Sequence, residues 1–245
     1  PKEVRLVGAG LPGVFYGIQT LRQLIHEHGA ALPCCTIADA PDFPVRGFYH
    51  DVTRGKVPKL ETLFRLADTL AYYKLNHLEL YVEHTFAFAE LADVWAGADP
   101  LTAEEILRLD EYCWKRHIDL VPSLSTFGHC YHLLRSKRRE QLNELDLKAS
   151  ELPFSFHDRM VHYTLNSSDD EAFRLVSGMI AEFAPLFSSK FFNICCDETF
   201  DLGAGKNAAK AKAAGKGHLY LDFVNRLIGV VRQQRKTPLL WGDIV

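Results

Sequence analysis

Apolar and polar positions follow a repeating rhythm along this chain, a short apolar run and then a longer stretch with helical spacing. The short runs have apolar residues on both faces, which is typical of strands covered on both sides in a parallel sheet. They predict strands at 46–52, 77–82, 118–124, 191–196 and 238–245. The spaced stretches predict helices at 59–74, 103–116, 131–142, 168–186 and 218–234. Alternation of this kind indicates a parallel α/β sheet.

The expected strands number five, whereas a closed (β/α)8 TIM-type barrel has eight. An open sheet of five strands would leave unpaired edges and an uncovered apolar interior. We therefore expect residues 42–245 to be the first five β/α units of such a barrel, truncated after the fifth strand. A doubly wound open sheet is the alternative architecture. Residues 143–165 show no clear period and are expected to form an excursion loop.

The first 41 residues do not share this rhythm. Residues 4–7 and 34–38 read as short strands, and residues 13–28 have apolar positions at helical spacing. A proline-marked linker follows at 39–44. Residues 1–41 are therefore expected to be the C-terminal part of a small α+β domain.

Composition narrows the class of partner. A net charge of −3 gives no electrostatic case for binding nucleic acid or an anionic membrane. No apolar run approaches the roughly 18 to 20 residues that span a bilayer. The six cysteines include two adjacent pairs but no CxxC motif, so they are expected to be small packing residues.

The strongest chemical signal is Asp197-Glu198, which directly follows the run at 191–196. Two acids have no place inside a covered strand, so they must lie where it ends. In α/β barrels the C-terminal ends of the strands carry the chemistry. The same dipeptide occurs at Asp110-Glu111 and Asp170-Glu171, but there it lies in helix-like stretches and predicts solvated surface charge.

Several stretches, in the same order, resemble glycoside hydrolase family 20, the β-N-acetylhexosaminidases. They are GVFYGIQTL at 13–21, DFPVRG at 42–47 with DVTR at 51–54, YKLNHL at 73–78, FGH at 127–129 and the unit from 165 to 198. ELYVE at 79–83 and WGD at 241–243 look most like the bacterial branch related to streptococcal N-acetylglucosaminidases. The resemblance implies that residues 1–41 are non-catalytic and that the rest forms the catalytic barrel.

The resemblance also implies a retaining exo-glycosidase that removes terminal β-linked N-acetylhexosamine by substrate-assisted catalysis. In that scheme the 2-acetamido oxygen of the substrate attacks C1, an exception to the usual pair of flanking carboxylates. Glu198 is then the general acid/base, and Asp197 holds the acetamide and stabilises the oxazolinium-like intermediate. His129 corresponds to a histidine that supports the acid/base glutamate.

The remaining family positions predict sugar contacts. Arg46 maps onto an arginine that grips the hydroxyls at O3 and O4, with a buried structural ion pair as the alternative. Trp241 maps onto an aromatic wall, with a core tryptophan as the alternative, and Asp243 could reach a hydroxyl. His84 stands where the family has an aspartate that pairs with the supporting histidine. Glu83 could supply that carboxylate.

Other activities are less well supported. The Gly/Ala/Lys-rich connection at 203–217 lacks the spacing of a phosphate-binding loop and is expected to be a mobile rim loop. No HExxH motif occurs, so neither a metal nor another cofactor is expected. The expected partner is an oligosaccharide or glycoconjugate that contains an amino sugar. A non-catalytic sugar-binding barrel of the same fold is the alternative function.

Overall fold

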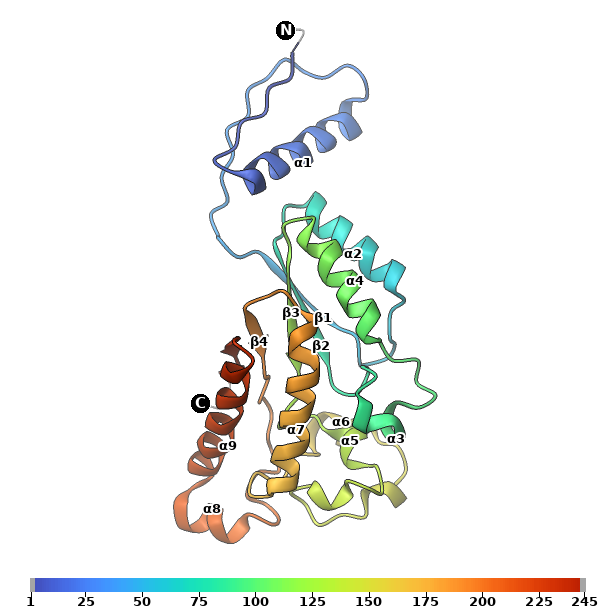
Figure 1. Ribbon diagram of the computed structural model, residues 1–245, viewed down its shortest axis with the longest axis vertical. Helices are drawn as coiled ribbons and strands as arrows, with labels where there is room; N and C mark the ends of the chain where they lie inside the picture. Colours follow the sequence, from blue (N-terminus) through green and yellow to red (C-terminus); the bar gives the residue numbers. More distant parts are fainter. Residues whose placement is uncertain (1–2, 243–245) are drawn as a thin grey trace.

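Five parallel strands lie side by side in the order in which they occur along the chain (Figure 1). The computed structural model describes residues 3–242. The strands are β1 (Gly47–Asp51), β2 (His77–Val82), β3 (Asp119–Leu124), β4 (Phe191–Asn193) and β5 (Thr237–Leu239). The helices α2 (Leu60–Tyr72), α4 (Ala103–Trp114), α7 (Asp170–Phe183) and α9 (Lys216–Gln233) alternate with them. The strand–helix rhythm expected from the sequence is therefore present.

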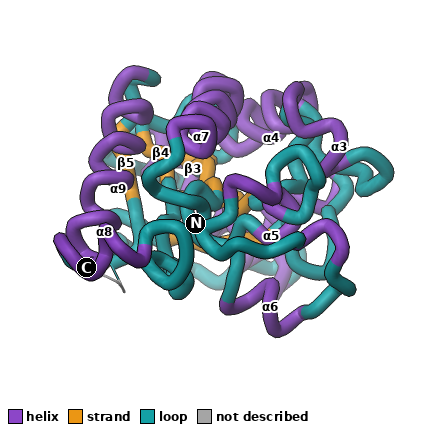
Figure 2. The backbone as a smooth tube through the Cα atoms, turned by 90° about the horizontal axis from the view of Figure 1, so that it is seen from below, coloured by secondary structure: helices purple, strands orange, loops and turns teal. Residues whose placement is uncertain are grey.

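The sheet curls so that its two outermost strands approach each other on the inside. The ring of Tyr49, in β1, lies 5.3 Å from the ring of Trp241, which follows β5, although three strands separate β1 from β5. Seen from below, β3, β4 and β5 lie inside an arc formed by α4, α7 and α9 (Figure 2). Parallel pairing brings the carboxyl ends of all five strands to one edge, which is where the acid pair follows β4.

Local signals set two of the helix starts. Thr102 and Glu105 form a capping box at the start of α4, because each side chain accepts a hydrogen bond from the backbone N–H of the other residue. The helix expected at 168–186 starts at Asp170, two residues later than expected. Its cap is Asp169, whose carboxylate accepts from two backbone N–H groups of the first turn.

The connections differ most from expectation. The helix expected at 131–142 is reduced to α5 (Tyr131–Leu134) and the 3-10 turn η2 (Glu140–Leu142). Arg135 donates to the carbonyls of Leu152 and Pro153, and Arg139 donates to Asp93. These tertiary contacts override the helical preference of the basic residues at 135–139. The other short connecting elements are η1 (Ala89–Leu91), α3 (Ala92–Trp95), η3 (Ala149–Glu151), α6 (Phe156–Val161), η4 (Ala184–Leu186) and α8 (Ala208–Ala214).

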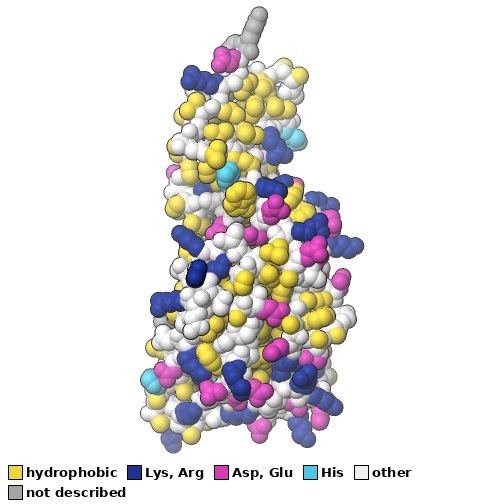
Figure 3. Space-filling view, viewed as in Figure 1, with side chains coloured by type: hydrophobic (Ala, Val, Ile, Leu, Met, Phe, Trp, Pro, Cys, Tyr) yellow, Lys and Arg dark blue, Asp and Glu magenta, His cyan; other side chains and the backbone are white. Residues whose placement is uncertain are grey.

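The segment before β1 contains α1 (Leu11–His28) between two extended stretches. The strands expected at 4–7 and 34–38 are not formed, because within residues 3–242 neither stretch pairs with a neighbouring strand. Their apolar side chains are consequently exposed, and hydrophobic side chains are prominent at this end of the molecule (Figure 3). None of the described helices combines the length and apolar character that crossing a bilayer requires.

Candidate active site

The turn after β4 aims the acid pair. Strand β4 was expected to reach residue 196 but ends at Asn193, because Cys195 and Cys196 have left-handed φ angles of 56° and 64°. Asn193 Oδ1 accepts from the backbone N–H of Cys195 at 2.8 Å, and Asn193 Nδ2 donates to Glu79 at 2.9 Å. The backbone N–H of Trp241 donates to the Cys195 carbonyl at 3.0 Å. Hydrogen bonds from β2, β4 and the end of β5 therefore hold a backbone shape that non-glycine residues rarely adopt.

The two thiols at this turn are packing groups. Cys195 Sγ lies 3.3 Å from Ser123 Oγ, and Cys196 Sγ lies 3.4 Å from Thr126 Oγ1. Both side chains are buried, and burial raises the pKa of Cys196 to about 12. A neutral thiol at ordinary pH is a poor nucleophile, which agrees with the packing role predicted from the sequence.

One histidine touches both acids. His129 Nε2 lies 3.4 Å from Asp197 Oδ2 and 3.2 Å from Glu198 Oε2. The imidazole is only 3% exposed, whereas the Asp197 and Glu198 side chains are 24% and 41% exposed. A ligand can therefore reach the carboxylates while the histidine supports them from within. Burial lowers the pKa of His129, but the hydrogen bond and negative charge of Asp197 outweigh it, so the pKa is raised.

Gly128 allows this contact. A Cβ added at Gly128 would lie 2.4 Å from the backbone oxygen of Asp197. The loop after β3 and the turn after β4 therefore meet backbone to backbone, which brings His129 within reach of the acids.

Glu83 lies behind His129 and is already paired. Its Oε1 accepts from Arg54 Nε at 3.3 Å and from the Tyr81 hydroxyl at 3.1 Å, and its Oε2 accepts from Arg159 Nη2 at 3.0 Å. The Glu83 side chain is 4% exposed. Glu83 was predicted to bind substrate, and this burial contradicts direct contact with a sugar.

His84 is also buried. Its ring stacks on His132 with 4.0 Å between centroids, and its side chain is 10% exposed. Burial, the neighbouring histidine and the charge of Arg159 lower the pKa of His84 to about 3. Its predicted contact with substrate is contradicted in the same way as that of Glu83. The sequence showed that His84 replaces the aspartate of the family, but it did not show that the His84 side chain is buried.

The prediction for Arg46 is wrong. Arg46 lies just before the amino end of β1, at the opposite end of the sheet from the acids. Its guanidinium donates to the carbonyls of Phe43 and Lys74 and lies over the Tyr16 ring. Sequence reasoning placed Arg46 inside the strand. Arg54, which follows the carboxyl end of β1, places its guanidinium on the side of the site.

Trp241 lies on the inner side of the sheet and is 40% exposed, with its ring edge-on to Tyr49. The Tyr49 hydroxyl lies 3.0 Å from Ser123 Oγ, and burial raises the pKa of Tyr49. Asp243 lies outside the described residues, so its predicted role stays a prediction.

Sequence reasoning missed an acid that organises the rim. Glu144, with no exposed surface, accepts hydrogen bonds from the backbone N–H groups of Gly203, Gly205 and Asn207. These contacts fold the Gly/Ala/Lys-rich connection into a defined turn before α8. The sequence does not distinguish Glu144 from the neighbouring acids Glu140 and Asp146, so this role could not be predicted.

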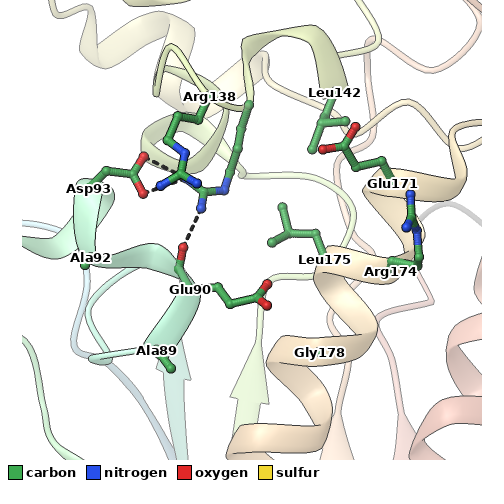
Figure 4. A pocket seen from close by; sticks show the side chains of 11 residues that line it. Ala89, Glu90, Ala92, Asp93, Arg138, Leu142, Glu171, Arg174, Leu175 and Gly178 are labelled. Carbon is green, nitrogen blue, oxygen red and sulfur yellow. Dashed lines mark hydrogen bonds and ion pairs between the residues drawn. The ribbon is translucent and has the colours of Figure 1, made fainter.

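Two further observations concern possible sites away from the acid pair. Within residues 3–242, no group of three or more His, Cys, Asp and Glu is arranged to hold a metal ion. A hollow with a volume of about 630 Å³ lies between η1–α3 and α7 (Figure 4). It has an apolar floor and side chains of both charges, and none of the predicted site residues line it.

A curled parallel β/α sheet with a histidine-supported acid pair at its carboxyl edge is typical of barrel enzymes. Comparison with known families gives the particular assignment. The chain belongs to glycosyl hydrolase family 20: the family's catalytic domain matches residues 43–245, and its domain 2 matches residues 1–40. The resemblance stated from the motifs is therefore confirmed.

Individual relatives agree with this assignment. The chain is 29% identical over 150 residues to a β-hexosaminidase of Akkermansia muciniphila, which covers 53% of this chain and 30% of the relative. It is 27% identical over 248 residues to a β-hexosaminidase of Vibrio furnissii, which covers 90% of this chain and 40% of the relative. The chain thus spans less than half the length of these two relatives.

Solved structures share the fold. The chitobiase of Flavobacterium johnsoniae superposes with a TM-score of 0.76 at 23% identity, covering 94% of this chain and 36% of that one. A mutant Streptomyces plicatus β-hexosaminidase in complex with its product GlcNAc gives a TM-score of 0.73 at 24% identity, covering 94% and 47%. The predicted α/β TIM-barrel fold is confirmed.

Proposed function

We propose that this chain carries the acid pair of a retaining exo-β-N-acetylhexosaminidase that works by substrate-assisted catalysis. The observation that carries the proposal is the contact of one buried histidine with two adjacent, accessible carboxylates. Adjacent residues cannot flank a glycosidic bond from opposite faces, so a scheme with one protein acid and a nucleophile on the substrate suits them. Family membership supports the same reaction.

In the proposed reaction Glu198 protonates the leaving oxygen while the carbonyl oxygen of the 2-acetamido group attacks C1. The bond from C1 to the leaving oxygen breaks, and a positively charged oxazolinium ring forms. Asp197 accepts the acetamide N–H and balances that charge. Glu198, now ionised, takes a proton from water as the water attacks C1 and opens the ring. Two inversions at C1 give overall retention.

The other residues divide between binding and support. Arg54 takes the role first given to Arg46, because a guanidinium fork at the carboxyl edge suits a pair of vicinal hydroxyls. Trp241 offers an exposed indole for the apolar face of the sugar. His129 positions both acids, and Glu83 holds Arg54. The substrate is an oligosaccharide or glycoconjugate that ends in an N-acetylhexosamine.

The division of the chain is part of the proposal. Residues 1–41 are assigned to a non-catalytic α+β domain, and residues 42–245 are assigned to the first five β/α units of the catalytic barrel. The ranges matched by the two family domains support a boundary at this place.

The test is hydrolysis of an aryl β-N-acetylglucosaminide by the complete gene product. Glu198→Gln is expected to lower kcat by at least about 10²-fold because it removes the proton donor. With Glu198→Ala and a substrate carrying a good leaving group, added azide should form a β-glycosyl azide. Asp197→Asn should lower kcat because the amide leaves the oxazolinium charge unbalanced.

The Asp110-Glu111 pair, which has the same sequence as the acid pair, offers a matched control. Glu111 lies in an exposed i,i+4 ion pair with Lys115 on α4, and Glu111→Gln should leave kcat unchanged. An unchanged rate in Asp197→Asn would exclude its role with the acetamide. Absence of hydrolysis by the wild-type protein would favour the non-catalytic sugar-binding barrel.

A further inference from the structure

A small cavity lies behind His129. It leaves about 10 Å³ of room for the centre of a water molecule, which is close to the least that one buried water needs. Seven residues line it, namely Glu83, His84, Ser125, His129, Cys130, His132 and Leu133. Most of these offer polar atoms, and empty cavities in proteins are usually apolar.

One lining atom has no partner. His84 Nδ1 is buried and makes no hydrogen bond with any described residue. Glu83 Oε2 lies 3.9 Å from this nitrogen, too far for a hydrogen bond but suited to a bridge through water. An unpaired buried nitrogen is destabilising, so a partner is expected.

His129 borders the same space. Both of its carboxylate contacts use Nε2, and His129 is one of the residues that line the cavity. Nδ1, the ring nitrogen not used in those contacts, is therefore assigned to the cavity. We propose that one ordered water molecule occupies this cavity and connects His129 Nδ1 with Glu83 Oε2 and His84 Nδ1. The water accepts from His129 Nδ1–H and donates one hydrogen to Glu83 and the other to His84, so three of its hydrogen bonds are made.

The bridge gives Glu83 and His84 a positioning role. With Nδ1–H held by water, His129 Nε2 accepts from protonated Glu198 or, in the imidazolium form, donates to ionised Glu198. Asp197 and Glu198 face the ring on one side. The charges of Arg54 and Glu83 also act on it, and the Cys130 thiol is its chain neighbour.

Around His84 the charged or titratable neighbours are Glu83, His132 and Arg159. Arg159 holds Glu83 Oε2 at 3.0 Å, which keeps a negative acceptor beside the cavity. The lowered pKa of His84 keeps its ring neutral, so Nδ1 can accept a hydrogen bond from the water. The bridge therefore links His129 to the carboxylate of Glu83. The family resemblance places the corresponding carboxylate one residue later, at the position of His84.

The first test is a crystal structure of the complete gene product at a resolution that shows ordered water. A peak within hydrogen-bond distance of His129 Nδ1, Glu83 Oε2 and His84 Nδ1 is expected. An empty cavity, or direct contact between Glu83 and His129, would overturn the proposal. This readout needs no turnover, so it stands even if the proposed glycosidase function fails.

The second test is kinetic and rests on the proposed function. His84→Phe keeps the stacked ring, removes Nδ1 and fills part of the cavity, so the water is lost. We expect kcat to fall about tenfold with KM near that of wild type. The limb of the pH profile that reports His129 should move to lower pH, because its N–H has lost an acceptor.

The matched control is His132→Phe, the same substitution on the partner ring of the stack. It should cause a smaller loss and keep the wild-type pH profile. Equal losses and equal profiles in the two variants would assign the effect to packing and overturn the bridge. A His84→Phe protein that gains thermal stability and keeps its kcat would show that the cavity is dry.

Discussion

Gly128→Ala tests whether the aim of the acid pair depends on the close approach of two backbones. The added Cβ would lie 2.4 Å from the Asp197 carbonyl oxygen, whereas ordinary contact begins at 3.4 Å. One of the two loops must therefore move by about 1 Å. Both loops carry site residues, and a misplacement of this size costs about 10²-fold in rate. Overpacking should also lower the free energy of unfolding by about 1–3 kcal/mol.

The assay is kcat and KM on an aryl β-N-acetylglucosaminide, with a thermal melt of each variant. Gly178→Ala is the matched control, because Gly178 lies within α7 and an added Cβ meets no atom within 4 Å. Alanine there should raise stability by about 0.5–1 kcal/mol and leave kcat unchanged. A Gly128→Ala enzyme with kcat/KM within threefold of wild type would refute the reasoning.

Three further predictions concern stability and reactivity. Glu144→Gln turns an amide donor toward the Asn207 side-chain amide, which is itself a donor. The free energy of unfolding, measured by urea titration, should fall by about 1–3 kcal/mol. A loss below about 0.5 kcal/mol would contradict the role of this acid. Iodoacetamide at pH 7.5 should label only the exposed thiols Cys34 and Cys35 in the native protein, as counted by mass spectrometry, and any further label before unfolding would count against the buried positions of the others. Burial lowers the pKa of His84 to about 3 and of His132 to about 4, below the 6.5 of the unfolded chain, so stability is full above pH 6.5 and falls by up to about 1.4 kcal/mol per pH unit per histidine toward pH 4. His84→Phe should flatten that fall, and an unchanged slope would contradict the burial of this ring.

The main elements and the acid pair could be predicted because they depend on local pattern. The run 77–82 matches β2 at both ends, and Thr102 with Glu105 marks the start of α4 correctly. Periodicity reports which face of an element is buried, and capping uses side chains only three residues apart.

The remaining features depend on contacts between distant segments. The basic run after α5 leaves the helical pattern because Arg139 finds Asp93 in another connection. Arg46 was assigned to the sugar on the family resemblance alone, although its place at the start of the run 46–52 puts it at the amino end of β1. The bend at Cys195 was missed since no glycine marks it, and the hydrogen bond from Asn193 that holds it closes only in the folded chain.

The bend that carries the acids also predicts how the protein fails under stress. Cys195, Cys196 and Glu198 all have positive φ angles, and each such residue costs about 1–3 kcal/mol that its surroundings must offset. Mild heat or low denaturant should therefore relax this turn before the helices and strands melt. Inactivation should come at a lower denaturant concentration than the loss of circular dichroism, and removal of the denaturant should restore activity quickly.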